Sequence, residues 1–465
     1  MPKPVTGRDL LWGYAASALN IGVGLILLPI TLRYLSAEDV GLWIVFVTLA
    51  SLAQLLEMGF QPTLARNAAY VYSGAQKLYK EGLPGEVCLT GKINKPLLDT
   101  LVSSARRIYQ VVAIIAALIL LLAGTLYIST LLTPNQPKIN SLIAWIAFAS
   151  GYVLNFYYGY INGILQGRGD VSQANKVVII TRSLMILLGG SAVALGSGII
   201  GLGIASMLAA AVGRIAAHRF FYAGYMPSGD ITGKELLESQ KEIVKILWHN
   251  ASKMGVAQLG AFLIQRGNIL IASSSLGLAV AASYSITITI LITLAGISMV
   301  LSQLQVPLMS AMQAKNDRKS LAAIYGQILI LGWITYGVGL ALLLNYGPHL
   351  LYLLGSKTSL PPNELMFALG IIFLLEVNHS IAATYLSTTN KIPFVNAAIL
   401  SGAAILLGSI MTVPYLGLAG IIFIQGLVQL SYNNWKWPAE ALKNIGFSLW
   451  SVLILGSKRM VNVSR

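Results

Sequence analysis

The feature that most constrains the fold is a series of continuous apolar stretches that runs through nearly the whole chain. A helix needs about 20 apolar residues to cross the hydrocarbon core of a bilayer. Only 10% of the 465 residues are charged, whereas soluble domains carry about 25%. The sequence therefore predicts an all-α polytopic membrane protein. Outer-membrane barrels are excluded, because they are built from short strands of alternating polarity.

We count twelve candidate membrane spans. They are 11–33, 40–61, 108–131, 141–164, 177–196, 199–219, 254–276, 281–309, 323–346, 363–386, 393–412 and 415–434. The first is interpreted as a retained span and not a signal peptide, since no small-residue cleavage site follows it. The apolar stretch from Gly446 to Gly456 is too short to cross, so we expect it to lie in the membrane interface or to be disordered.

Basic residues are distributed unevenly between the two sides that these spans define. With the N-terminus inside, internal loops and span ends hold 27 of the 31 Lys and Arg residues, and only Arg33, Lys138 and Lys357 fall outside. This positive-inside bias predicts an N-in, C-in topology. It also explains the net charge of +15 without a nucleic-acid partner. Arg266 is the one basic residue that the count leaves within the membrane.

The two halves of the chain share a pattern when residues 1–219 are laid on 247–434. Leu165–Asp170 and Leu386–Lys391, for example, form polar turns after the fourth and tenth spans, and the first of these, with Arg168-Gly169-Asp170, is interpreted as a turn. The pattern predicts a parallel 6+6 repeat, with two six-helix lobes around a central site. The predicted divisions are an N-lobe (1–219), a basic cytoplasmic linker (220–253), a C-lobe (254–434) and a cytoplasmic or interfacial tail (435–465). In the linker, 234–253 has the pattern of an amphipathic helix lying on the inner leaflet.

Residues Leu28 to Trp43, followed by Leu56 to Phe60 and Arg66, resemble the polysaccharide-transporter branch of the multidrug/oligosaccharidyl-lipid/polysaccharide exporter superfamily. The resemblance extends over residues 8–434. It implies twelve helices in two lobes around a cavity that flips undecaprenyl-pyrophosphate-linked O-antigen or related glycans across the bacterial inner membrane. The partners implied are that lipid-linked glycan, membrane lipids and downstream polymerase or assembly proteins.

Nothing in the sequence indicates an enzyme or a bound cofactor. There is no nucleophile–base pair, no metal-ligand spacing among the four histidines and no GxxxxGK[ST] phosphate-binding loop. We therefore expect no catalytic residue, metal or cofactor. Active transport would draw on an H⁺ or Na⁺ gradient or on a downhill substrate reaction.

Arg266 is the first candidate for a substrate contact. It lies in the apolar stretch Ala257–Ser275, where a charge costs about 2.5–3.5 kcal/mol. Gln258 and Gln265 share one helical face, with Arg266 at its edge. A guanidinium binds phosphate through two hydrogen bonds, which suits a pyrophosphate group. The alternative is a buried pair between Arg266 and Glu376.

Five further residues are candidates for the cavity: Arg33, Arg66, Asn20, Tyr152 and Asn155. Arg33 ends the first span at the outer face, and Arg66 would attract the pyrophosphate at the inner face. Asn20 is a mid-membrane polar residue without an assigned partner. Tyr152 belongs to an aromatic stripe in the fourth span, and Asn155 lies beside it. An aromatic face together with an amide suits the binding of a sugar. The alternatives are snorkelling to headgroups for Arg33 and helix packing for the stripe.

Three residues are candidates for coupling or gating. Glu376 and His379 are three residues apart and so share a helical face, which suits a proton relay or an ion site. A satisfied polar pair is the alternative. Because Asn155 takes the place of Glu376 in the first half, coupling would be confined to the second half. Glu57 is expected to pair with Arg66, or else to act as an inner gate.

Three other functions stay open. An ion-coupled multidrug antiporter of the same superfamily would need acids in its cavity to bind cationic drugs. A membrane polysaccharide polymerase would need large outer loops, and all the predicted outer loops are short. A lipid II flippase would have a first span richer in arginine.

Overall fold

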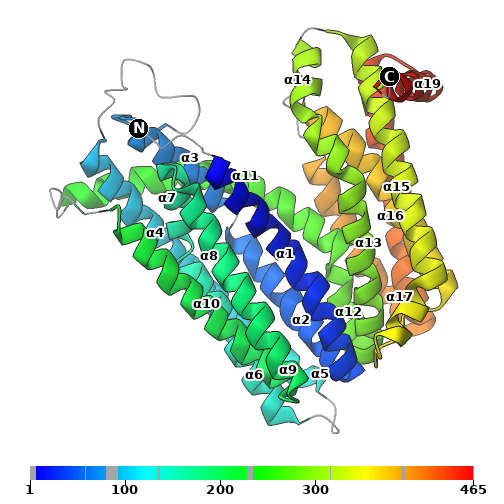
Figure 1. Ribbon diagram of the computed structural model, residues 1–465, viewed down its shortest axis with the longest axis horizontal. Helices are drawn as coiled ribbons and strands as arrows, with labels where there is room; N and C mark the ends of the chain where they lie inside the picture. The colour runs from blue at the N-terminus through cyan, green and yellow to red at the C-terminus, as the bar shows by residue number, and fades with distance from the viewer. Residues whose placement is uncertain are drawn as a thin grey trace. The chain divides into compact units, whose positions relative to one another are not determined.

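The computed structural model describes residues 7–57, 59–79, 93–132, 137–225, 227, 234–314, 316–388 and 394–463. Every regular element in these ranges is a helix, which confirms the all-α prediction (Figure 1). The chain divides into two compact units, which we call unit 1 (Met1–Gln258) and unit 2 (Leu259–Arg465).

Unit 1 contains the first eleven α-helices, of which the last continues into unit 2. They are α1 (Gly7–Tyr34), α2 (Ala37–Gln54), α3 (Phe60–Tyr72), α4 (Lys95–Ala117), α5 (Thr125–Leu131), α6 (Lys138–Tyr157), α7 (Tyr160–Arg168), α8 (Val171–Leu184), α9 (Gly190–Ala194), α10 (Gly198–Tyr222) and α11 (Lys234–Gln265). A 3-10 turn, η1 (Leu55–Glu57), follows α2, and π-helical segments η3 (Leu118–Gly124) and η4 (Met185–Gly189) follow α4 and α8.

The helices of unit 1 pack closely where small residues allow it. α10 lies along α6 and α8, and α8 lies beside α1 (Figure 1). A Cβ added at Gly203 of α10 would lie 2.3 Å from the Ala144 carbonyl oxygen of α6. Glycine is therefore required for this close approach of two helices.

Unit 2 continues α11 and adds eight helices. They are α12 (Gly267–Ser275), α13 (Leu278–Leu304), α14 (Val306–Ala314), α15 (Arg318–Leu353), α16 (Asn363–Ser387), α17 (Val395–Ser431), α18 (Asn433–Ile445) and α19 (Leu449–Val463).

Within the described ranges, nine helical stretches are long and apolar enough to cross a membrane. The difference from twelve has three sources. One stretch, Val395–Ile445, contains two predicted spans, because α17 is broken at Gly417 (φ 54°). The first predicted span corresponds to α1, in which the apolar part Gly22–Tyr34 is shorter than the length counted as a span. The seventh is divided between α11 and α12 at Arg266. The helices are thus those that a twelve-span fold requires.

The C-terminal helix α19 is ordered against α15, so of the two alternatives for Gly446–Gly456 disorder is wrong, and a position in the membrane interface stays a prediction. A Cβ added at Gly326 would lie 2.0 Å from the Val452 carbonyl oxygen, and one added at Gly456 would lie 2.4 Å from the Gly326 carbonyl carbon. Arg459 Nε donates to Gln327 Oε1 at 3.0 Å. Paired glycines therefore bring the two helices into backbone contact, which a count of apolar residues does not reveal.

The linker helix α11 packs on unit 1. Its residues Ile243, Ile246 and Leu247 belong to a buried cluster that includes Phe60 of α3. Gln240 Nε2 donates to Ser103 Oγ of α4 at 2.9 Å. Protein therefore covers Ile243, Ile246 and Leu247, and the position of the helix on the inner leaflet stays a prediction.

Candidate functional site

Arg266 lies at the break between α11 and α12. Its backbone N–H still donates to the Phe262 carbonyl at 2.8 Å, but its φ of −126° ends the helix there. The side chain is half-buried, that of Gln265 is also half-buried, and Gln258 is exposed. The pairing of Arg266 with Glu376 stays a prediction.

Gln265 connects α11 to the candidate coupling residue. Its Nε2 donates to Glu376 Oε1 at 3.0 Å, and Glu376 is 8% exposed. The other carboxylate oxygen, Oε2, has no hydrogen-bond partner among the described residues. A buried oxygen with this free capacity can accept a proton or contact a cation.

His379 lies on the same face of α16 as Glu376 but contacts a different helix. Its Nδ1 is 3.0 Å from Asn434 Oδ1 of α18. Glu376 therefore contacts the amide of Gln265 on α11, and His379 contacts the amide of Asn434 on α18. In the described part of the chain, no group of three or more His, Cys, Asp or Glu side chains could hold a metal ion.

A row of amides in unit 2 was missed by the sequence analysis. Gln425, Gln429 and Asn433 follow one another at intervals of four residues and are all buried. Asn433 Nδ2 donates to Ser401 Oγ at 2.8 Å and to Gln429 Oε1 at 2.9 Å. Trp437 Nε1 donates to Asn433 Oδ1 at 3.1 Å. The spacing of four was the available signal, since it places all three amides on one helical face.

Glu57 has partners that the sequence did not predict. Tyr109 OH donates to Glu57 Oε1 at 2.9 Å, and Gln54 donates to Oε2. Arg214 of α10 interacts with it electrostatically. The expected pairing of Glu57 with Arg66 is wrong, because Arg66 is exposed on α3 and the carboxylate is bound to α2 and α4.

Arg214 is a buried cation that the sequence analysis assigned to the internal end of a span. It is 9% exposed and lies two turns before the end of α10, and its Nε has no hydrogen-bond partner among the described residues. The sequence did not indicate the interaction of Arg214 with Glu57, because the two residues are more than 150 positions apart in the chain.

Arg182 and Asn20 form a polar contact between α8 and α1. Arg182 Nε donates to Asn20 Oδ1 at 2.8 Å, and both side chains are exposed on unit 1. Arg182 belongs to the candidate span Val171–Ala194, whose apolar part begins at Val177, after the mostly polar residues 171–176. It therefore lies near the internal end of that part, where the positive-inside count placed it. That Arg266 alone lies within the membrane stays a prediction.

The remaining cavity candidates of unit 1 are Arg33 on α1 and Tyr152 and Asn155 on α6. Arg33 is exposed, with its guanidinium 5.7 Å from the ring centroid of Tyr34. Tyr152 is half-buried and lies 4.9 Å from the Phe148 ring, and Asn155 is half-buried. The contact of Tyr152 with Phe148 fits the packing interpretation of the aromatic stripe.

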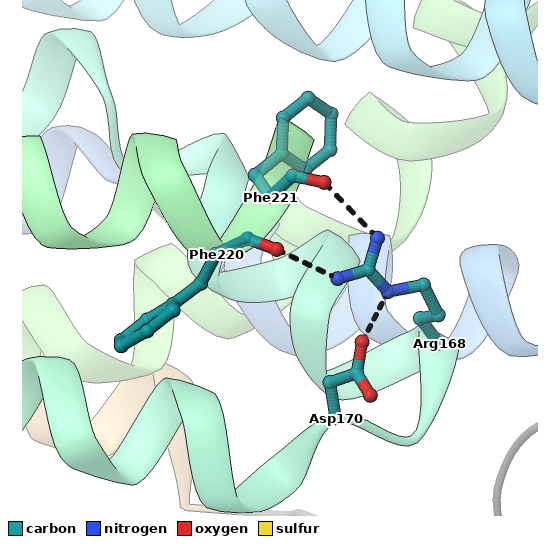
Figure 2. Close-up of polar contacts among 4 residues, drawn as sticks. All are labelled: Arg168, Asp170, Phe220 and Phe221. Carbon is teal, nitrogen blue, oxygen red and sulfur yellow. Dashed lines mark hydrogen bonds and ion pairs between the residues drawn. The ribbon is translucent and has the colours of Figure 1, made fainter. Parts of the chain in front are cut away.

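The Arg168-Gly169-Asp170 tripeptide is a turn, as expected from the sequence. Gly169 has a φ of 86° and ends α7. Figure 2 shows the Arg168 side chain reaching Asp170 and the end of α10. Its two Nη atoms donate to the carbonyls of Phe221 and Phe220 at 3.1 and 3.0 Å. The carbonyls at a helix end lack intrahelical partners, so Arg168 caps α10.

A second contact holds the same end of unit 1. Tyr225 OH donates to Asp99 Oδ1 at 2.7 Å. Burial, together with this bond to the Asp99 carboxylate, raises the pKa of Tyr225 above its ordinary value. The phenol therefore remains a donor, and the chain after α10 stays tied to α4.

No family model matches the chain, and no curated protein matches its sequence. Several solved structures do resemble it. An inward-facing multidrug resistance MATE family transporter of the MOP superfamily is 13% identical, with 99% of this chain and 96% of that chain covered and a TM-score of 0.64. A point mutant of a MATE protein is 16% identical, with 98% and 100% covered and a TM-score of 0.54. An outward-facing multidrug resistance MATE family transporter of the same superfamily is 14% identical, with 94% of each chain covered and a TM-score of 0.50. At these identities the likeness establishes the fold alone: the chain is a multi-pass helical protein with the fold of MATE transporters.

Proposed function

We propose that this protein is a membrane transporter that works by alternating access. The observation that carries the proposal is the likeness to a transporter structure over 99% of the chain, at a TM-score of 0.64. The membrane-spanning helices and the intramembrane polar residues of both units support it.

Of the specific transport functions, ion-coupled multidrug antiport is better supported than flipping of a lipid-linked glycan, because two of the similar structures are described as multidrug resistance transporters. Glu376 suits the coupling step. It is buried, and Gln265 binds one of its oxygens while the other has no partner among the described residues. Protonation of that oxygen, or its contact with Na⁺, would change the charge inside unit 2.

A specific observation favours a second candidate, the flipping of undecaprenyl-pyrophosphate-linked oligosaccharides across a bacterial inner membrane. Arg182, Arg214 and Arg266 all lie within the predicted spans 177–196, 199–219 and 254–276. Positive charge in the membrane suits an anionic substrate and repels a cationic drug. Arg266, Arg33 and Arg66 are then the residues to test for contact with the pyrophosphate.

A dye-accumulation assay tests the antiport candidate. A strain that lacks its main drug exporters would express the wild-type chain or Glu376→Gln, and the accumulation of ethidium and of carboxyfluorescein would be measured with and without a protonophore. We expect the wild type to lower accumulation of a dye in a protonophore-sensitive way, and Glu376→Gln to abolish the effect.

The flippase candidate needs a deletion of this gene in the source organism. Accumulation of lipid-linked repeat units at the inner face would support it, and reintroduced Arg266→Ala should then fail to restore surface glycan. If neither dye responds and the deletion leaves surface glycan and its lipid-linked precursors unchanged, the transporter proposal fails.

A further inference from the structure

The C-terminal helix α19 crosses the first part of α15 (Figure 1). A Cβ added at Gly456 would lie 2.4 Å from the Gly326 carbonyl carbon, so the two helices touch through their backbones. Val452 and Arg459 also contact α15 there, and their spacing of four and three residues from Gly456 places all three on one helical face. One face of α19 is therefore fixed on a membrane-spanning helix.

The crossing lies between the charged start of α15 and its exposed apolar part. α15 begins at Arg318, which is exposed, whereas residues 321–333 are buried or half-buried. Ile334 begins a strip of exposed apolar side chains at intervals of four residues. Gly326 is eight residues from Arg318 and eight from Ile334, which is about 12 Å of helix in each direction. By the predicted topology this end of α15 is cytoplasmic, so α19 lies at the level where the span passes from headgroups into hydrocarbon.

A second face of α19 carries large apolar side chains that remain exposed in unit 2. Trp450, Ile454 and Val461 are spaced at four and seven residues, so they share one side of the helix. Their exposed fractions are 73%, 39% and 56%. Such a strip marks a surface that meets another apolar surface. Because tryptophan is enriched where a membrane meets water, lipid suits this strip at this level.

The charge of this end of the chain favours lipid over a second copy as the partner. Lys458 is exposed and lies beside the strip, four residues after Ile454. Residues 446–465 contain Lys458, Arg459 and Arg465 and no acidic residue. In a twofold dimer formed through this strip, two such ends would repel each other. The cytoplasmic surface of a membrane carries anionic lipids that attract basic residues.

A third face of α19 is polar at its start. The Ser451 N–H donates to Ser448 Oγ at 3.3 Å, and the two hydroxyl oxygens are 2.9 Å apart. Ser448 is exposed and Ser451 is half-buried. A helix with one apolar side, one polar side and basic residues has the pattern of a helix that lies in the plane of the membrane interface.

We propose that α19 is a membrane-interface helix that binds the lipid surface of the cytoplasmic leaflet. Trp450, Ile454 and Val461 insert below the headgroups, and Lys458 reaches the headgroups while its stem lies on apolar surface. The glycine crossing sets the height of α19 on α15, so lipid contact and helix contact hold the same end of the span. The inference concerns how unit 2 meets the membrane and does not depend on what the protein transports.

The test uses the fluorescence of Trp450 in the full chain, in nanodiscs of phosphatidylcholine and phosphatidylglycerol. The lipid is replaced by one brominated on the upper part of its acyl chains, or iodide is added to the solution. The signal of Trp450 is the quenching of the wild type minus that of Trp450→Phe. We expect the brominated lipid to quench this signal several-fold more than iodide does, because the strip lies about 5–10 Å into the interface. Trp145→Phe is the matched control, since Trp145 is 0% exposed and its difference signal should respond to neither quencher.

Two charge variants separate lipid contact from folding. Val461→Asp places a carboxylate in the strip, about three turns from Trp450, and should reduce the quenching of Trp450 by the brominated lipid by about twofold or more. Ser448→Asp adds the same charge outside the strip and keeps a side chain that caps a helix, so its quenching should equal that of the wild type. Because both positions are exposed, both variants should keep the wild-type unfolding midpoint in detergent.

Quenching of Trp450 by iodide but not by the brominated lipid would place the strip in water and overturn the proposal. Quenching by neither would show that protein covers the strip, a second copy included, and would overturn it as well. An equal loss in both charge variants would assign the effect to charge alone and refute the role of the strip. The transport assays do not affect these outcomes, so this inference and the proposed function fail separately.

Discussion

The two units bury different kinds of polar residue, although both are apolar helical bundles. Among the described residues, unit 1 buries the charged side chains of Arg168, Asp170 and Arg214, and unit 2 buries Glu376. Amides show the opposite distribution. Unit 1 buries two, and unit 2 buries five, namely Asn268, Gln425, Gln429, Asn433 and Asn434.

This difference predicts how the stability of each unit responds when a buried polar residue is substituted. A buried charge is stable only with its partner, so removing one member of a pair leaves the other uncompensated. An amide both donates and accepts, so a row of amides can exchange partners at lower cost. Unit 1 is therefore expected to be held in one arrangement by its charges, whereas unit 2 can accommodate a proton or an ion.

The largest expected effect is in the charged interior of unit 1. Arg168→Leu should lower the free energy of unfolding by about 3–5 kcal/mol, since the buried Asp170 loses the guanidinium charge and the end of α10 loses its cap. Thermal unfolding in detergent measures the loss, with Arg107→Leu, at an exposed site on α4, as the control. An equal midpoint in the two variants would contradict the capping role.

The next effect tests whether the amides of unit 2 are as replaceable as proposed. Asn433→Ala removes three hydrogen bonds, to Ser401, Gln429 and Trp437. We expect a loss of about 2–3 kcal/mol, smaller than for Arg168→Leu because the freed groups are neutral and can pair again. Thermal unfolding in detergent measures this loss as well. A loss larger than that of Arg168→Leu would reverse the comparison between the units.

A smaller effect concerns the second charged contact of unit 1. Glu57→Gln and Arg214→Met should each destabilise the protein, and the double variant should lose less than their sum. We expect a coupling of about 1–2 kcal/mol, because the two charges compensate each other in a buried region. Strict additivity in this double-mutant cycle would show that Tyr109 and Gln54, not Arg214, stabilise the Glu57 carboxylate.

The smallest expected effect is Glu376→Gln in unit 2. The amide keeps an oxygen to accept from Gln265 and places a donating NH₂ group at the position of the unpartnered oxygen, so stability should change by less than about 1 kcal/mol. Unfolding midpoints at matched pH measure this. A loss comparable to that of Arg168→Leu would mean that Glu376 is part of a charged pair, as its predicted pairing with Arg266 would require.

The sequence predicted the fold class because length and hydropathy alone determine that these helices are membrane spans. It predicted less of the polar interior. Arg182 was counted at the internal end of its span, so its contact with Asn20 of α1 was not predicted, and Arg214 was missed because its partner Glu57 is distant in the chain. Pairings between helices depend on helix rotation and register, which one sequence does not encode in any local pattern.

Local signals succeeded where the contact itself is local. The turn at Arg168-Gly169-Asp170 was expected because glycine readily adopts the positive φ that ends a helix. The Gln265–Glu376 contact combined two candidates that had been chosen separately. The bonds from Arg168 to the end of α10 could not be foreseen, because they join residues more than 50 positions apart.

The backbone contact between α15 and α19 has a consequence for synthesis. Val452 leaves the ribosome roughly 130 residues after Gly326, a delay of about 6–25 s at ordinary elongation rates. During that interval the groove at Gly326 has no helix to fill it. A chain that ends before α19 would leave this strip of the α15 backbone uncovered by its partner helix.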